Sequence, residues 1–464
     1  MVRLDVLVIS GLVFLAGCDS EVEGPLEPTS DASVDASVEG SVPEPDAMPA
    51  MPAIVVWDGE RAVSEQRYGE PFSLRVTGLE PLQIAVLRAR FWGYEGWAEL
   101  QADEMGRIDT ESTPSRDGTY EGIAADGLLW SMELQTPERG DSFDVDFDLE
   151  VDGEVVTSYR LNRTPIDVGL VSEPVSEPGL VGTLFYPESS EPLGGILVLG
   201  GSEGGLETAS FRAATIAGDG YAALALAYFG APGLPAELLE IPVEYFGQAL
   251  EWMMRHPAID PDRLAVFGAS RGGELALMLG SRYGEIDAVI AEVPSGLRWG
   301  GGVSAGSGWS ADGVPLAFVR TPPTASPSLE RLRDGSTGYR FSTMFEQALA
   351  LATPTEIAAA TIPVEQTSGA VLMLGGADDD LWPSCELAQV AADRLAAEAG
   401  REDRFVCYAD TGHFIGSPGW PTTEAFVSTL QDGTRVSMGG TAEGTARAQR
   451  AAREEILEFL GRHL

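Results

Sequence analysis

The pattern of apolar and polar positions divides the chain into two parts with different periods. Between Ile54 and about Arg163, apolar residues alternate with polar ones in short runs such as "FSLRV", "IAVLRARFW" and "FDVDFDLEV", separated by Gly, Pro and Asp clusters. Alternation with a period of two is typical of strands that bury one face, and no long helical period interrupts it. The pattern therefore predicts an all-β sandwich domain, which we place at 54–165.

After Pro165 the apolar runs become nearly continuous and alternate with helical periods. Strands that are apolar at almost every position are typical of a parallel sheet with helices on both faces. The pattern predicts an α/β domain over 166–464, with a mostly parallel sheet flanked by helices. The clearest helical periods cover 241–255, 273–283, 385–399 and 442–463. The apolar strands are expected at 195–201, 221–228, 263–268, 288–293, 370–376 and 404–409.

The first residues, "MVRLDVLVISGLVFLAGCDS", have the pattern of an export signal. A short basic start precedes an apolar run from Val6 to Phe14, which is too short to span a membrane, and the run ends in "LAGC". This ending resembles the lipobox of bacterial lipoproteins and predicts a lipoprotein signal peptide at 1–18, with lipidation of Cys18. An ordinary cleaved signal or an uncleaved anchor are the alternatives. We expect a lipid-anchored protein of the bacterial cell envelope, outside the cytoplasm.

Residues 19–53 differ from the rest in composition. They contain no aromatic residue and no arginine and are rich in Pro, Ser, Asp and Glu. Such a segment cannot bury enough apolar surface to offset the backbone entropy that folding would cost. We therefore predict a disordered acidic tether between the anchor and the folded domains.

The charge balance restricts the partners. The chain has 29 basic residues, none of them lysine, against 72 acidic ones, a net charge of −43 at pH 7. The tether carries nine of the acids, so the folded part keeps −34. A charge of this size repels nucleic acids and anionic membrane surfaces and favours neutral or cationic ligands. We predict no nucleic-acid partner and no protein partner, and membrane contact only through the anchor.

Two further cysteines, Cys385 and Cys407, lie in the α/β part. In an oxidising compartment they could pair, but buried unpaired thiols are the preferred interpretation, since free cysteine behaves as a small apolar residue.

Ser270 is the candidate nucleophile, chosen among three matches to Gly-x-Ser-x-Gly. Its stretch, "RLAVFGASRGGELALM", passes from an apolar strand through the serine directly into a helical period. A strand that turns sharply into a helix is crowded, which favours glycine two residues before and after the nucleophile, as at Gly268 and Gly272. Ser202, in "GGSEGG", also follows a strand and is the alternative. The third match, at 302–306, has no strand before it.

A serine hydroxyl becomes a good nucleophile only when a base takes its proton. The chain has three histidines. His413, in "YADTGHFI", follows the last predicted strand, where a loop can bring the imidazole over the serine. His256 and His463 lie at predicted helix ends, and we interpret them as surface or capping residues.

The base needs an acid that fixes its tautomer. "GADDDLW" supplies Asp378, Asp379 and Asp380 after a predicted strand, and we choose Asp379, with Asp378 as the alternative. Asp380 is expected to face water or to cap the next helix. The order Ser, Asp, His along the chain is that of an α/β-hydrolase. The three acids have no histidine or cysteine grouping beside them, and we predict neither a metal site nor a cofactor.

An oxyanion hole requires main-chain N–H groups beside the nucleophile. In this fold one comes from the residue after the nucleophile, here Arg271, and another from the loop after an earlier strand. We assign the second donor to Ser202 or Glu203, because the glycines around them let the backbone approach closely. The aromatic-containing segment at 295–355 is predicted to form either an acyl pocket or lid, or loosely ordered packing.

Several stretches, in this order, carry a resemblance to a known family. They include "GLLWSM", "GGSEGGL", "LALAYFG", "PVEYFGQALEWMMRHPAI", "GASRGGELALML", "GADDDLW" and "YADTGHF". Together they resemble the acyl-CoA thioester hydrolase/bile acid-CoA:amino acid N-acyltransferase family over most of 54–464. The resemblance implies a β-sandwich before an α/β-hydrolase, acyl-CoA cleavage or acyl transfer to an amino acid, and Ser270, Asp379 and His413 as nucleophile, acid and base.

Two features modify what the resemblance implies. The amino-acid-conjugating branch has cysteine where this chain has Ser270, and a serine acyl-enzyme favours hydrolysis. An exported enzyme with so acidic a surface meets little coenzyme A and offers no cationic cradle for its phosphates. We therefore expect a serine hydrolase acting on acyl thioesters or esters, with a neutral or hydrophobic natural substrate. A carboxylesterase, an acyltransferase to an amine and a non-catalytic surface binding lipoprotein are the alternatives.

Overall fold

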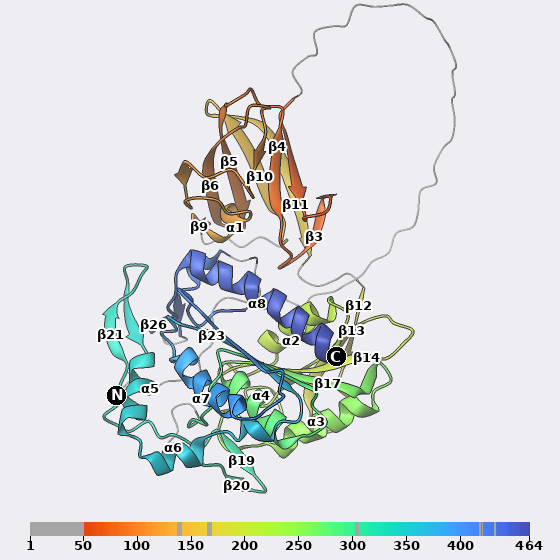
Figure 1. Ribbon diagram of the computed structural model, residues 1–464, viewed down its shortest axis with the longest axis vertical. Coiled ribbons are helices and arrows are strands. Elements are labelled where there is room, and N and C mark those ends of the chain that lie inside the picture. The colour runs from red at the N-terminus through yellow and green to blue at the C-terminus, as the bar shows by residue number, and fades with distance from the viewer. Residues whose placement is uncertain are drawn as a thin grey trace, which may run out of the picture.

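The computed structural model describes residues 51–136, 142–164, 169–301, 306–416, 419, 421–430 and 433–464. The predicted signal peptide with Cys18, and the predicted tether up to residue 50, lie outside the described residues. The chain forms a β-sandwich and a larger α/β domain, which meet along helix α8, Ala442–His463 (Figure 1). No helix in the described part of the chain is long and apolar enough to cross a membrane.

The first domain is a sandwich of two sheets, as the alternating pattern predicts. In β5 every second side chain from Ala85 to Phe91 is buried, and the alternate positions face solvent or lie half-buried. A short helix, α1 (Gly127–Trp130), closes one end of the sandwich. One sheet has the order β2-β1-β4-β7, with β1 Ala53–Trp57, β2 Ala62–Val63, β4 Ser73–Thr77 and β7 Ile108–Asp109. The other has the order β3-β11-β10-β5-β6-β8 with β9 beside β6, namely β3 Glu65–Arg67, β5 Ile84–Phe91, β6 Tyr94–Gln101, β8 Asp117–Gly118, β9 Glu133–Leu134, β10 Val145–Val151 and β11 Glu154–Thr164.

The second domain is built on an eight-stranded sheet of order β12-β13-β15-β14-β17-β18-β23-β24. From β15 to β24 neighbouring strands are parallel, whereas β12 and β13 run antiparallel at one edge. All six predicted apolar strands lie in this sheet, which confirms the predicted α/β fold. The strands are β12 Leu170–Pro174, β13 Val181–Pro187, β14 Leu193–Leu199, β15 Ala222–Ala227, β17 Ile259–Ala269, β18 Ala288–Glu292, β23 Ala370–Gly376 and β24 Arg404–Tyr408.

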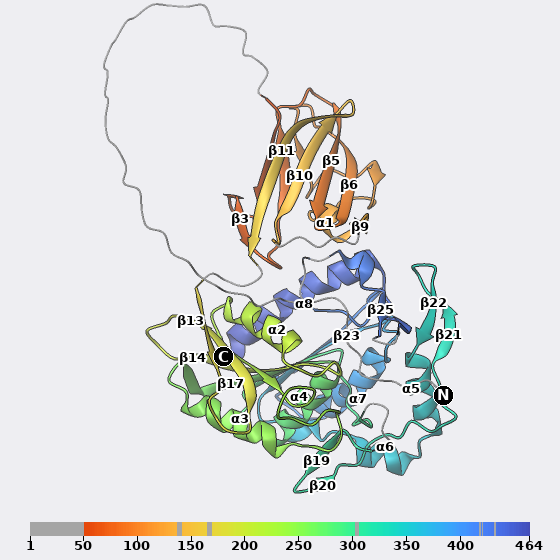
Figure 2. The same ribbon diagram turned by 180° about the vertical axis from the view of Figure 1, so that it is seen from behind.

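Helices cover both faces of this sheet, which explains why its strands are apolar at almost every position. In β14, Leu197 and Leu199 face one helix layer, and Ile196 and Val198 face the other. Helices α3, α4 and α7 form the first layer, and α2 and α8 the second (Figure 2). Their bounds are α2 Glu207–Ala217, α3 Glu244–Arg255, α4 Arg271–Arg282 and α7 Ser384–Ala396.

The segment between β18 and β23, predicted as a lid or as loose packing, contributes ordered small elements at one side of the domain. Its β21–β22 hairpin pairs with β26 and so extends a small sheet of order β21-β22-β26-β25. A second small sheet has the order β16-β19-β20. The bounds are β16 Ile241–Pro242, β19 Trp309–Ala311, β20 Val314–Pro315, β21 Ser328–Arg331, β22 Thr337–Arg340, β25 Val427–Thr429, β26 Arg435–Ser437, α5 Ser342–Leu351, α6 Pro354–Ala360, and the 3₁₀ helices η1 Val364–Gln366 and η2 Thr422–Glu424.

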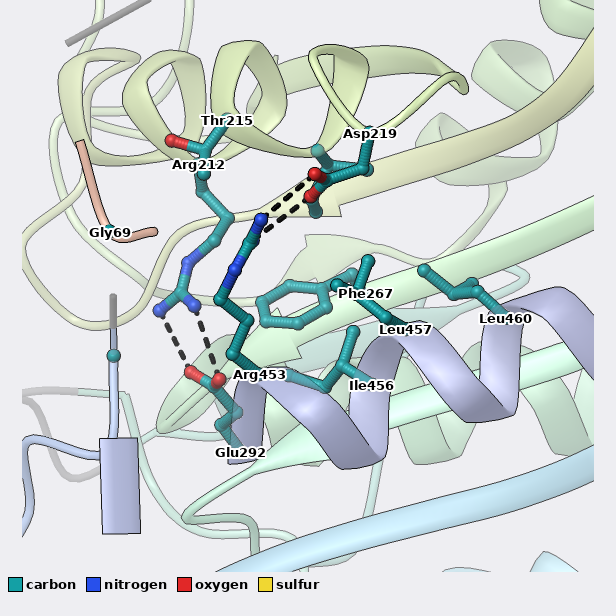
Figure 3. Close-up of a pocket in the computed structure, with 12 residues that line it drawn as sticks. Gly69, Arg212, Thr215, Asp219, Phe267, Glu292, Arg453, Ile456, Leu457 and Leu460 are labelled. Atoms are coloured by element: carbon teal, nitrogen blue, oxygen red, sulfur yellow. Dashed lines mark hydrogen bonds and ion pairs between the residues drawn. The ribbon is translucent and has the colours of Figure 1, made fainter. Parts of the chain in front are cut away.

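The interface between the domains contains ion pairs and hydrogen bonds. Asp219, just after α2, binds Arg67 of the sandwich at 3.1 Å and Arg453 of α8 at 2.9 Å. Arg450 of α8 binds both carboxylate oxygens of Asp126, which precedes α1, at 2.7 Å. The Asp219–Arg453 pair lines a pocket at this interface (Figure 3). The sandwich is thus bound directly to α2 and α8.

The two cysteines do not form the buried unpaired thiols that we preferred from the sequence. Cys385 in α7 and Cys407 in β24 form a disulfide, with their Cα atoms 5.7 Å apart. Cys385 is half-buried and Cys407 is exposed, so neither is the buried free thiol that we expected. The prediction failed because the sequence does not show that the first turn of α7 packs beside β24.

Candidate active site

Ser270 lies at the turn between β17 and α4, with a backbone conformation that side chains rarely adopt. Its φ and ψ are 57° and −119°. A Cβ on Gly268 would lie 2.0 Å from the carbonyl oxygen of Gly272, and one on Gly272 would lie 2.4 Å from that of Gly200. Only glycine fits at both positions, as predicted for a nucleophile elbow. Ser202, the alternative nucleophile, has no positive φ, and most of the third match, 302–305, lies outside the described residues.

His413 and Asp379 form a buried hydrogen-bonded pair. The Nδ1 of His413 lies 2.8 Å from Oδ2 of Asp379, and the two side chains are 5% and 0% exposed. The other oxygen, Oδ1, accepts the N–H groups of Leu381 and Trp382 at 3.0 and 3.3 Å. This arrangement holds the carboxylate still and leaves Nε2 of His413 as the ring nitrogen available for proton transfer.

The neighbouring acids have different roles. Asp378 is exposed. Asp380 neither faces water freely nor caps a helix, contrary to expectation, because it pairs with Arg340 at 2.9 Å and accepts the hydroxyl of Ser437 at 2.6 Å. Burial raises the pKa of Asp380, and these two partners oppose the rise. Its partners come from β22 and β26, two short strands that the sequence did not predict.

The other two histidines lie away from Ser270. His256 ends α3 as the expected capping residue, but its ring is largely buried between Tyr186 and Trp252, so it is not a surface residue. His463 is the last residue of α8 and packs on Phe459.

The candidate oxyanion donors lie on two segments beside Ser270. The N–H of Arg271 is the first of α4 and has no partner inside the helix. Neither this N–H nor that of Ser202 donates to another described residue. At Glu203 the side chain also takes part, since its Oε1 accepts the N–H of Gly201 at 3.0 Å. Arg271, Ser202 and Glu203 all stay predicted donors.

The side chain of Arg271 points away from this role and is bound inside the protein. Its Nη1 donates to Glu274 at 2.6 Å, and its Nη2 to the carbonyl of Trp299 at 3.1 Å. Glu274 also accepts the indole N–H of Trp309 at 2.6 Å. Burial raises the pKa of Glu274, and the charge of Arg271 opposes the rise. These hydrogen bonds connect the segment after β18 to α4, the helix that begins after Ser270.

The aromatic residues of that segment are mostly packed inside it. Trp299, Trp309 and Phe341 are 2%, 0% and 5% exposed, which favours the packing interpretation for these three side chains. Phe345 is half-buried and contacts both Trp299 and Trp382, with ring centroids 4.8 and 5.8 Å apart. The ring centroids of Trp382 and His413 are 6.3 Å apart, so this aromatic cluster extends to His413.

The structure brings His413 and Asp379 together but shows no hydrogen bond between His413 and Ser270. Among the described residues the hydroxyl of Ser270 has no hydrogen-bond partner. A Cβ on Gly201 would lie 3.3 Å from Cβ of Ser270 and 2.8 Å from Oε2 of Glu203, so the nucleophile candidate and this carboxylate are both neighbours of the same glycine. Sequence reasoning assigned a role only to the main chain of Glu203.

Two family models match the chain. The "Acyl-CoA thioester hydrolase/BAAT N-terminal region" covers 69–175, and "BAAT / Acyl-CoA thioester hydrolase C terminal" covers 241–464, the part with Ser270, Asp379 and His413. Human acyl-coenzyme A thioesterase 1 is 30% identical over 416 residues, which span 86% of this chain and 94% of that protein. The chain belongs to the acyl-CoA thioester hydrolase/BAAT family. It is a hydrolase with an α/β-hydrolase domain.

Other relatives show the range of the acyl-CoA thioester hydrolase/BAAT family. The peroxisomal succinyl-coenzyme A thioesterase of Mus musculus is 30% identical over 420 residues, which span 86% of this chain and 94% of the relative. The acyl-coenzyme A amino acid N-acyltransferase 1 of the same species is 29% identical over 422 residues, which span 85% of this chain and 95% of the relative. The family therefore includes transferases as well as thioesterases.

Proposed function

We propose that the chain hydrolyses acyl thioesters through a covalent acyl-enzyme on Ser270. The observation that carries the proposal is the buried Asp379–His413 pair in the same domain as a serine on a strained elbow. The absence of a bond between Ser270 and His413 does not oppose it, because catalytic hydrogen bonds often close only when substrate binds.

The chemistry follows from these positions. His413 takes the proton of Ser270 while Oγ attacks the carbonyl carbon, and the N–H groups of Arg271 and Ser202 stabilise the oxyanion. The intermediate collapses, the C–S bond breaks, and the leaving sulfur takes the proton from His413 and departs as a thiol. Water then gives a proton to His413 and attacks the acyl-enzyme. The second intermediate collapses, the carboxylic acid leaves, and Ser270 regains its proton.

The substrate class has support from the relatives, whose names specify coenzyme A thioesters. The charges of the described residues support two versions of the proposed substrate, a neutral one and an anionic one. Most arginines pair with acids, which favours a neutral ester or thioester. The side chains of three exposed arginines between β18 and β23, however, make no ion pair or hydrogen bond with a described residue: Arg320, Arg331 and Arg333. These positive charges are available to an anionic leaving group such as coenzyme A.

Activity-probe labelling tests the nucleophile. A fluorophosphonate should label the wild-type protein and the Ser202→Ala variant, but not Ser270→Ala. Removing the nucleophile should lower kcat by about 10⁶-fold. Labelling of Ser270→Ala but not of Ser202→Ala would reverse the assignment.

A substrate panel then separates the two versions. The wild-type enzyme is compared on an acyl-CoA and on the p-nitrophenyl ester of the same acyl chain, at several salt concentrations. Fast, salt-insensitive turnover of acyl-CoA would contradict the neutral-substrate version, whereas fast ester turnover with slow acyl-CoA turnover would support it. Added glycine or taurine should leave free acid as the product, because a serine acyl-enzyme is expected to react with water.

We also propose that the folded part works in the cell envelope, anchored through Cys18. The Cys385–Cys407 disulfide supports an oxidising compartment, because cytosolic thiols are kept reduced. Fractionation of expressing cells tests the anchor. The Cys18→Ala variant should leave the membrane fraction in which the unaltered protein is found, and retention of the variant would contradict lipid anchoring.

A further inference from the structure

The turn formed by Gly200 and Gly201 is held from two sides. The hydroxyl of Tyr228 lies 2.7 Å from the carbonyl oxygen of Gly200 and 3.2 Å from that of Gly201, and donates to them. On the N–H side, Oε1 of Glu203 accepts the amide of Gly201 at 3.0 Å. Because a trans peptide places its N–H opposite its carbonyl, the bond from Tyr228 to Gly201 directs the N–H of Ser202 the other way.

The carboxylate of Glu203 shares its space with the nucleophile. A Cβ on Gly200 would lie 3.0 Å from Oε1 of Glu203. A Cβ on Gly201 would lie 2.8 Å from Oε2 and 3.3 Å from Cβ of Ser270. Glu203 and Ser270 therefore both lie beside Gly201, and a side chain at this position would collide with the carboxylate.

The carboxylate of Glu203 has one hydrogen bond that fixes its place, since its Oε1 accepts the amide of Gly201 at 3.0 Å. No arginine pairs with it among the described residues. Burial raises the pKa of Glu203, and hydrogen bonding to the carboxylate opposes the rise.

We propose that Glu203 is a positioning residue that fixes the oxyanion turn beside Ser270. This rests on the proposed function. The carboxylate of Glu203 accepts the N–H of Gly201, and the hydroxyl of Tyr228 binds the carbonyls of the same turn, so the N–H of Ser202 keeps one direction.

Two substitutions test the positioning role. Glu203→Gln keeps an acceptor for the Gly201 amide in a side chain of nearly the same shape, so kcat and KM should both be nearly retained.

Glu203→Ala removes the acceptor. The oxyanion turn loses one of its two fixing contacts, so kcat should fall by about 10- to 100-fold with a smaller change in KM, somewhat less than for direct loss of a donor. Tyr228→Phe, which removes the contact on the other side of the turn, should show a similar fall in kcat. Glu207→Gln, an exposed acid at the start of α2, is the matched control and should move neither parameter.

The outcomes distinguish this inference from the proposed function. If the wild-type protein turns over no ester or thioester, or if Ser270→Ala keeps its activity, the proposed function fails. If Ser270 is required but Glu203→Ala keeps full kcat, or Glu203→Gln loses as much kcat as Glu203→Ala, the role of Glu203 is overturned while the function stands. Glu203→Gln nearly preserves the shape of the side chain, so it shows whether the retained acceptor restores kcat.

Discussion

The main-chain N–H of Ser270 donates to the carbonyl of Glu292, at 2.9 Å. Glu292 ends β18, and its side chain, 2% exposed, binds Arg212 of α2 through both carboxylate oxygens, at 3.1 and 2.8 Å. Figure 3 shows this pair beside the pocket at the domain interface. Val293, the next residue, has a φ of 40°, which is unusual for a β-branched side chain. The strained turn at Ser270 is thus bound to a second strained strand end.

Removing Arg212 should affect both stability and catalysis. Arg212→Met leaves the Glu292 carboxylate buried without its partner, and breaking a buried pair in this way costs about 3 kcal/mol or somewhat more. We expect a clearly lower melting temperature and a reduced kcat, because the strand end that holds Ser270 is disturbed. Arg462→Met, in an exposed pair with Glu458, is the control and should change little. Equal melting temperatures for the two variants would contradict this.

Asp379→Asn should lower kcat by about 10⁴-fold with little change in stability. The amide has nearly the same shape, but it favours the wrong tautomer of His413 and cannot stabilise the imidazolium. Asp378→Asn, at the exposed neighbour, serves as the control in the same loop. Steady-state kinetics on one substrate measures both variants. A larger loss for Asp378→Asn would assign the acid to that residue.

The disulfide should contribute to stability. Cys385 and Cys407 are 22 residues apart, and a bridge across a loop of this size stabilises a fold by about 3 kcal/mol. The double variant Cys385→Ser/Cys407→Ser should therefore unfold at a lower temperature, and reductant should lower the melting temperature of the wild-type protein but not that of the variant. If reductant has no effect on either protein, the bridge is not formed in solution.

Asp219 should be a main contributor to the domain interface. Asp219→Asn weakens its bonds to Arg67 and Arg453, and because the aspartate is only 8% exposed we expect a cost of about 1–3 kcal/mol. Limited proteolysis should cut between the domains more readily in the variant. Asp410→Asn, in an exposed pair with Arg447, is the comparison. Unchanged proteolysis of Asp219→Asn would show that other contacts hold the interface.

The parts of the fold that could be predicted are those with local signals. The apolar strands of the central sheet and the four clear helices follow from periodicity, because burial on one or two faces fixes the residue type at each position. The elbow at Ser270 could be predicted because crowding demands glycine at Gly268 and Gly272. His413 could be selected because few histidines exist and one follows the last strand.

The parts that could not be predicted depend on contacts between distant segments. Strands of two to four residues, as in β16, β19 and β22, are too short to show a period. The disulfide depends on how α7 lies against β24. The position of the Glu203 carboxylate depends on the glycines beside it as much as on the residue type at 203. The sequence alone therefore does not show which side of the turn the carboxylate occupies.

The attachment of the sandwich near the segment that follows His413 affects how domains of related proteins can be exchanged. The main-chain carbonyls of Trp130 and Met132, from the "GLLWSM" stretch, accept the hydroxyls of Thr422 and Thr423, which follow His413 by about ten residues. A chimera joined at the linker between the domains would thus place a foreign surface against the loop that carries the imidazole. Exchange of the sandwich among homologous proteins should succeed best when the stretch from 419 to 450 is transferred with it.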